Sequence, residues 1–234
     1  MTRFPLAYAH WEVRDYFRGP GAILIAIAAL AAVILVRLPA AAVFESEDTI
    51  ATIAGQSLFP LCLIVTAGMV SRDLAEGWYR AYFSRPVAPS FFYLQRWLLG
   101  GIVFLLYIPL LAAAVAIRTG EFVVPGWIVG RAALLYLLVG GTVFLFSTLT
   151  RRDWVVAALL FIVYSVLHGL LSKGVPLGSL ARTIHAVLPP YHAGSLDSQL
   201  SSGDIRGALV YGVAMVLAAM AVLKWRPMGS GGRA

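Results

Sequence analysis

Apolar residues gather into blocks without charged side chains, separated by polar stretches. A helix of roughly 20 residues crosses the hydrocarbon core of a bilayer, and each block reaches or approaches that length. Inside lipid, a helix satisfies its own backbone hydrogen bonds. The pattern therefore predicts an all-α integral membrane protein with six transmembrane helices, as a single domain over 1–234. The blocks are 21–36, which continues past Arg37 to Phe44, then 50–70, 97–117, 132–149, 154–171 and 207–223.

The segments outside these blocks have patterns of their own. Residues 1–18 place apolar side chains on one helical face, which predicts an amphipathic helix lying in the membrane interface. Glu12 and Asp15 within this segment are unlike the basic leader of a signal peptide, so we do not expect cleavage. The long connection 172–206 has a helical middle ended by Pro189 and Pro190, and we expect it to lie on or dip into the outer leaflet. Residues 228–234 have the composition of a disordered tail.

Charge sets the expected orientation. The chain is 60% hydrophobic and 12% charged, with a net charge of +7. With six spans, the side that holds both termini carries twelve Lys and Arg against five acids, whereas the other side carries six of each. By the positive-inside rule, both termini are cytoplasmic and the chain is a multi-pass protein of the cytoplasmic (inner) membrane. The positive balance thus reflects topology, and no contiguous basic face predicts nucleic-acid binding.

Several kinds of chemistry lack their motifs. The chain has no GxxxxGK[ST] phosphate loop, no GxGxxG following a strand and no HExxH zinc helix. Cys62 is the only cysteine, so an intrachain disulfide is excluded. We therefore expect no catalytic residues, no cofactor-binding residues and no metal ligands in this chain.

A few polar residues near the spans leave alternatives open. His185 and His192 are spaced as possible metal ligands, but surface histidines are the commoner interpretation. His168 is expected to be hydrogen-bonded within the bundle, and Arg131 to extend towards the outer interface. Gly126 and Gly130 form a GxxxG pattern, a weak signal for close helix packing.

The connection between the second and third spans holds a charged island, SRDLAEGWYRAYFSRP, at 71–86. Asp73 and Glu76 suit the start of a helix. Helical spacing puts an apolar stripe through Leu74, Gly77 and Trp78, with Asp73, Glu76 and Arg80 away from it. Since Pro86 disfavours helix at the residue before it, we expect one amphipathic helix over 71–85 at the cytoplasmic surface. A second helix then follows from Ser90 into the third span.

This island carries a family resemblance. Glu76-Gly77 followed by Ser84-Arg85-Pro86-Val87 resembles the EG…SRPV signature of the six-span, type-2 permease subunits of ATP-binding-cassette exporters. The order of elements along most of the chain is also similar, although Trp78 stands where that family commonly has a small polar residue. The resemblance implies that 71–96 is a coupling segment contacting a separate ATPase subunit. The implied contact residues are Asp73, Glu76, Gly77, Arg80, Arg85 and Pro86.

The expected function follows from the resemblance. The chain is expected to be the permease subunit of an exporter, forming the translocation pathway with a second permease copy or a paralogue in membrane lipid. Two cytoplasmic ATPase subunits would hold the ATP and magnesium. Two alternatives are an ion-coupled multipass carrier, which needs a titratable residue at the membrane midplane, and a scaffold or assembly factor that does not transport.

Overall fold

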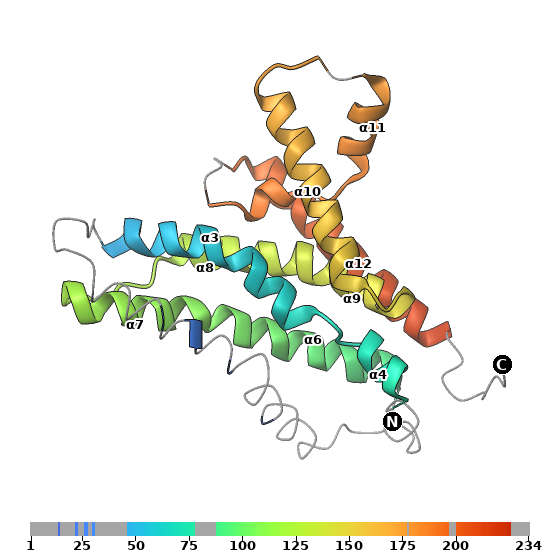
Figure 1. The fold of residues 1–234 in the computed structure, drawn as a ribbon, viewed down its shortest axis with the longest axis horizontal. Helices are drawn as coiled ribbons and strands as arrows, with labels where there is room; N and C mark the ends of the chain where they lie inside the picture. Colours follow the sequence, from blue (N-terminus) through green and yellow to red (C-terminus); the bar gives the residue numbers. More distant parts are fainter. Residues whose placement is uncertain are drawn as a thin grey trace.

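The computed structural model describes residues 46–77, 88–176, 178–196 and 200–225, together with five single positions before residue 46. The predicted interfacial helix, the first predicted span and the tail therefore lie outside the described residues. The described elements are all helical (Figure 1). They are α3 Ser46–Thr66, α4 Ser71–Glu76, α6 Pro89–Leu105, α7 Tyr107–Thr119, α8 Gly126–Leu135, the π-helical turn η2 Tyr136–Gly140, α9 Gly141–Leu149, α10 Asp153–Ser172, α11 Ser179–Val187, the 3-10 turn η3 Tyr191–Gly194 and α12 Ser202–Trp225.

Within the described residues, five helical segments are long and apolar enough to cross a membrane. They correspond to the second through sixth predicted spans, which confirms a helical, membrane-type architecture for this part of the chain. The segment Gly126–Leu149 is the most buried of the five and Asp153–Ser172 the least. Figure 1 shows α3, α6, α7 and α8 lying side by side, whereas α10 leaves this group and carries α11 beside it.

Two of the spans are not continuous α-helices. The third span is interrupted at Leu106 between α6 and α7. Pro109 lacks the N–H that would reach back to the carbonyl of Leu105, so the break falls where the helical ladder loses a hydrogen bond. The fourth span widens into a π turn, η2, between α8 and α9. Neither interruption was predicted from the hydrophobic pattern, because both helical halves are equally apolar.

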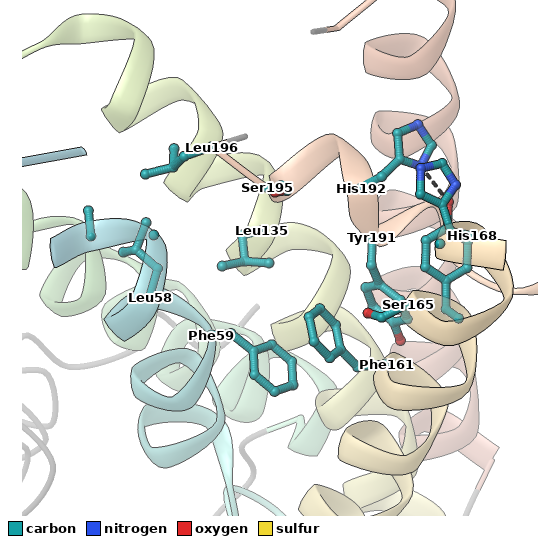
Figure 2. Close-up of a pocket in the computed structure, with 15 residues that line it drawn as sticks. Leu58, Phe59, Leu135, Phe161, Ser165, His168, Tyr191, His192, Ser195 and Leu196 are labelled. Atoms are coloured by element: carbon teal, nitrogen blue, oxygen red, sulfur yellow. Dashed lines mark hydrogen bonds between the residues drawn. The ribbon is translucent and has the colours of Figure 1, made fainter. Parts of the chain in front are cut away.

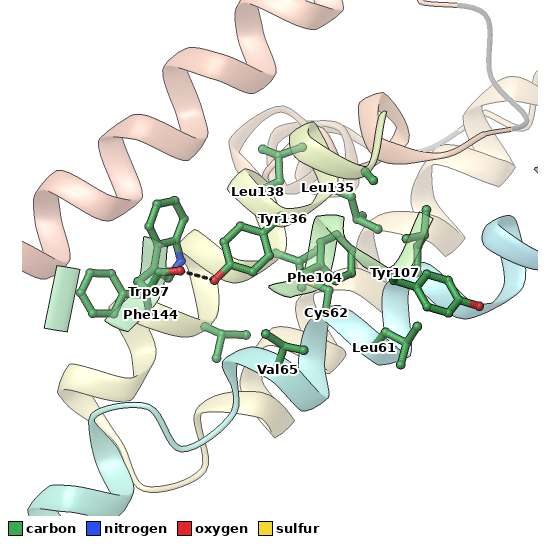
Figure 3. Close-up of a cluster of buried hydrophobic side chains, with 14 of the residues drawn as sticks. Leu61, Cys62, Val65, Trp97, Phe104, Tyr107, Leu135, Tyr136, Leu138 and Phe144 are labelled. Carbon is green, nitrogen blue, oxygen red and sulfur yellow. Dashed lines mark hydrogen bonds between the residues drawn. The ribbon is translucent and has the colours of Figure 1, made fainter. Parts of the chain in front are cut away.

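The core is aromatic where η2 meets α6. The Tyr136 hydroxyl donates a 2.6 Å hydrogen bond to the carbonyl of Trp97. The rings of Trp97 and Phe104 lie 5.2 and 5.4 Å from the Tyr136 ring, centroid to centroid. Phe144 on α9 extends the same cluster (Figure 3). A phenol buried at this depth requires a hydrogen-bond acceptor, and the Trp97 carbonyl serves as one.

The close helix packing occurs at a different place from the one that the GxxxG pattern suggested. Within the described residues, a Cβ atom built on Gly126 or Gly130 would meet nothing within 4 Å, so this pattern marks no close contact there. The close approach is instead between α12 and η2. A Cβ on Gly212 would overlap the Leu137 side chain and lie 3.0 Å from the Leu137 carbonyl oxygen.

This contact generates a stability prediction. Gly212→Ala should lower the free energy of unfolding by about 1–3 kcal/mol, because the backbone of η2 has to move to admit the methyl group. Gly207→Ala on the same helix is the matched control, since a Cβ there meets nothing within 4 Å. Reversible unfolding of the purified protein in detergent or bicelles measures both variants. Equal stability of the two would contradict the packing described here.

Candidate functional site

The predicted coupling segment begins with a tight turn and a short helix. The turn at 67–70 leads from α3 into α4, which ends at Glu76. Gly77 has φ of +78°, a left-handed conformation that glycine adopts without a steric penalty. The prediction of one regular helix over 71–85 was therefore wrong at Gly77, which ends α4 rather than continuing its apolar stripe.

The backbone of the turn finds its hydrogen-bond acceptors on other spans. The Ser147 hydroxyl oxygen on α9 accepts the N–H groups of Val70 and Ser71, both at 2.9 Å. Ser147 is 1% exposed. The first N–H groups of a helix have no partner within the helix itself. Ser147, on the fourth predicted span, thus caps the N-terminus of α4 in place of a local residue. The predicted cap by Asp73 and Glu76 does not form.

Asp153, at the start of α10, is the second acceptor. Its Oδ2 atom accepts the Gly68 N–H at 2.9 Å and the Ser71 hydroxyl at 3.2 Å. Its Oδ1 atom accepts the Trp154 N–H at 2.9 Å. The carboxylate is 1% exposed, and its place in the first turn of α10 suits the positive end of the helix dipole.

Arg96 on α6 provides a third connection. Its Nη1 atom donates to Asp73 Oδ2 at 2.7 Å and to the Met69 carbonyl at 3.2 Å. The Asp73 side chain is only 8% exposed. The prediction that Asp73 points away from the apolar face was therefore wrong, because its charge is paired inside the chain. We name this set of residues the α4 bracket: the turn 67–70, Ser71, Asp73, Arg96, Ser147 and Asp153.

The outer surface of α4 is different in character. Arg72 Nε donates to Glu76 Oε1 at 2.9 Å, and the two side chains are 73% and 45% exposed. Of the predicted contact residues, the structure therefore places Glu76 on the surface and Asp73 in the interior. Gly77 lies at the end of α4, and Arg80, Arg85 and Pro86 lie outside the described residues. Two small hollows flank α4, of about 190 and 300 Å³, and both include Ser71 and Arg151.

The residues that hold the α4 bracket together were not predicted as site residues. Ser147 lies in an apolar block. From the sequence alone, a serine that accepts hydrogen bonds from another segment cannot be told from one that bonds to its own helix. In the sequence, Arg96 and Asp153 belong to the charges of the side that holds both termini, and no motif singles them out. Their position at the ends of spans that converge on one turn is the signal that could have identified them.

At a distance from the α4 bracket, the structure holds an open cavity of about 310 Å³ between α3, α10 and η3. Figure 2 shows Phe59 of α3 facing Phe161 of α10, with ring centroids 3.6 Å apart. The opposite wall is polar, with Ser165 and His168 from α10 and His192 from η3. The cavity thus combines an apolar wall with a few hydrogen-bonding groups, the usual composition of a small-molecule site.

The outer connection folds as the sequence pattern predicted in one respect. Its helical middle is α11, and Pro189 and Pro190 follow directly after it, which confirms that interpretation. The turn η3 is buried against α8, where Arg131 donates to the Ser195 carbonyl at 2.8 Å. Arg131 therefore holds the connection against α8. The sequence had predicted only that its side chain extends towards the outer interface.

The histidines of this region stack on one another rather than surrounding an ion. The His168 and His192 rings are nearly parallel, 4.7 Å apart between centroids. The described part of the chain contains no group of three or more His, Cys, Asp or Glu side chains arranged to hold a metal ion. His192 shares a hydrogen bond with the Tyr164 hydroxyl through Nδ1 and lies 3.3 Å from Asp204 Oδ1 through Nε2.

No known protein family matches the chain by sequence, and no curated protein is significantly similar to it. The chain is therefore characterised by its structure alone. The described residues form five helical segments long enough to span a membrane, the short helix α4 with its hydrogen bonds to other segments, and a separate cavity.

The α4 bracket generates a second stability prediction. Arg96→Ala should cost about 3 kcal/mol of unfolding free energy, because it leaves the Asp73 carboxylate buried without its cation. Arg72→Ala removes a similar ion pair at the surface and should cost about 0.5 kcal/mol or less. Unfolding in bicelles compares the two, with Asp73→Ala/Arg96→Ala as the double variant. If the double variant is no more stable than Arg96→Ala alone, the penalty does not arise from an unpaired Asp73.

Proposed function

We propose that this chain is the permease subunit of an ATP-binding-cassette exporter, and that α4 receives the movement of a separate cytoplasmic ATPase subunit. The observation that carries the proposal is the α4 bracket. A short, surface-exposed helix on the connection with the EG…SRPV resemblance is bonded to three other membrane-spanning segments through Arg96, Ser147 and Asp153. An ordinary surface loop has no need of buried acceptors from so many segments.

The bracket supplies a physical route for coupling. A displacement of α4 changes the positions of Val70, Ser71 and Asp73, and the hydrogen bonds of these residues end on α9, α10 and α6. Buried polar groups resist losing their partners, so these helices move with α4 rather than separating from it. An ATPase that pushes on Arg72 and Glu76 would thereby shift three membrane-spanning segments together.

The cavity between α3 and α10 also supports a role in transport. Its apolar wall and its polar end suit an amphiphile, whose two parts require different surroundings. The translocation pathway would run past this cavity and be completed by the second permease subunit. ATP hydrolysis belongs to the partner ATPase, which brings the magnesium ion with the nucleotide.

Site-specific photocrosslinking tests the partner. A photoreactive amino acid at Arg72, which is largely exposed on α4, should capture an ATP-binding-cassette ATPase in membranes of the native host. The matched control is the same group at Leu180 on α11, which is 74% exposed and distant from α4 in Figure 1. Capture of the ATPase at Arg72 but not at Leu180 is the expected result.

Crosslinking, together with assays of transport and ATP hydrolysis by the purified chain, separates the rival functions. A scaffold would give a crosslinked partner without a nucleotide-binding domain, or no partner at either position. An ion-coupled carrier would transport in proteoliposomes that contain this chain alone, driven by an ion gradient. Either outcome overturns the proposal, as does ATP hydrolysis by the purified chain.

A charge reversal tests the role of α4 directly. Glu76→Arg breaks the exposed pair with Arg72 and places like charges together on the proposed contact surface. The affinity of the chain for its ATPase should fall about tenfold, which corresponds to about 1.4 kcal/mol. Titration of the ATPase onto the chain in nanodiscs measures the change. Thr183→Arg, which adds a cation to the exposed face of α11, should leave the affinity unchanged.

A further inference from the structure

The geometry points to a proton-operated latch between α11 and α10: protonation of the histidines that join them releases α11 and uncovers the polar wall of the cavity. This inference concerns the connection between the last two described spans and does not depend on the identity of any partner. It is carried by the way in which α11 is attached.

The attachment of α11 is shallow, since none of its nine residues is buried. Its contacts with other elements include the ring stacking of His185 and a 2.6 Å hydrogen bond from the Tyr211 hydroxyl to the carbonyl of Val187. The following turn is held far more firmly, since Tyr191, Ala193 and Gly194 are all buried. A local change at His185 therefore acts on α11 without disturbing η3.

His185 is docked in a stack of aromatic rings. Its ring lies 4.9 Å from that of Tyr164 and 5.6 Å from that of His168, with interplanar angles of 16° and 12°. His168 in turn stacks on His192. Three imidazoles from α10, α11 and η3 are thus packed face to face, an arrangement that suits neutral rings.

Protonation changes the balance of charge in this stack. Cations on neighbouring imidazoles repel one another. Asp204 contacts one of these rings, that of His192, and also accepts the Ser201 hydroxyl. The ionisable groups in contact with the stack come from several elements: Tyr164 and His168 of α10, His185 of α11, Tyr191 and His192 around η3, and Asp204 of α12. Tyr211 of α12 reaches the Val187 carbonyl of α11. Acid therefore adds positive charge to a stack in which, among the described residues, Asp204 is the carboxylate in contact with an imidazole.

The sign of the pH effect follows from His185. Burial, and secondly the charge of His192, lower the pKa of His185 below its ordinary value. A histidine with a lowered pKa in the docked state favours docking while it is neutral. This contribution is full above the ordinary value of about 6.5 and is lost as the pH falls from there through the lowered pKa. The docked form of α11 is thus the neutral-pH form, and the released form belongs to acid.

Release has a consequence for the cavity. Tyr164 and His168, on which His185 stacks, also line the cavity between α3 and α10. When α11 departs, the face of these two side chains that it covered becomes accessible from the side of the membrane where the connection lies. Entry to or exit from the cavity at this end is then favoured by acid.

Hydrogen exchange of the full chain in lipid nanodiscs tests the latch. Amide exchange over α11 is compared at about pH 7.5 and about pH 5.5, either side of the ordinary histidine pKa, after correction for the intrinsic pH dependence of exchange. We expect the amide protection of α11 to fall in acid, while α9 stays protected. Equal protection of α11 at both pH values overturns the inference.

Two substitutions at His185 make the test specific. His185→Phe keeps a stacking ring but cannot be protonated, so α11 should stay protected at both pH values. His185→Arg carries a permanent charge and should lose protection already at neutral pH. Thr183→Arg is the matched control, because it adds the same charge on the exposed face of α11 and should behave as wild type. A wild-type pH response in His185→Phe, or release by Thr183→Arg, contradicts the latch, and protection of α9 reports whether each variant is folded.

Discussion

The buried end of the second predicted span depends on one constraint, namely that backbone N–H groups inside an apolar bundle must find acceptors. The turn at 67–70 breaks the helical ladder and leaves such donors without partners in their own helix. Ser147 and Asp153 accept them from two other spans. Because these acceptors are themselves buried, the turn, α9 and α10 are stable only in one relative arrangement. The position of the short helix α4, and of its exposed surface, is fixed by the same hydrogen bonds.

The same constraint explains why the two ends of the molecule behave differently. At the α4 bracket, buried polar groups are paired with groups on neighbouring spans, and an element cannot move without its partners. At the outer connection, η3 is buried, whereas α11 has no buried residue and inserts the His185 ring into a stack of aromatic rings. Stacked imidazoles hold α11 in place only while they are neutral. Rigidity and mobility along this chain thus follow from what kind of contact each segment makes, and not from its helical content.

Hydrophobic patterning alone located the second to sixth spans, because block length and the absence of charge are direct consequences of the bilayer core. It also located α11 through its proline stop. It did not reveal the interruption at Leu106 or the π turn, since these depend on tertiary contacts that leave the apolar pattern unchanged. For the candidate site, the pattern singled out the connection that holds α4 but placed Asp73 on its solvent-facing side, whereas the structure buries Asp73. Helical spacing places side chains relative to their own helix, whereas Arg96 lies on another one.

The π turn at Tyr136–Gly140 has a consequence for how this chain tolerates change in length. A π turn holds one more residue than the α-helical turn it replaces, so the span can lose a residue there and remain helical. Five residues of a π turn carry the chain through about the same rotation as four residues of α-helix, so such a deletion would leave the orientation of α9 relative to α8 unchanged. Ser147 would keep its place beside the turn that it caps. The same deletion in a regular α-helical part of the span would rotate α9 by about 100° and turn Ser147 away from α4. The span therefore tolerates the loss of a residue at the π turn and not elsewhere.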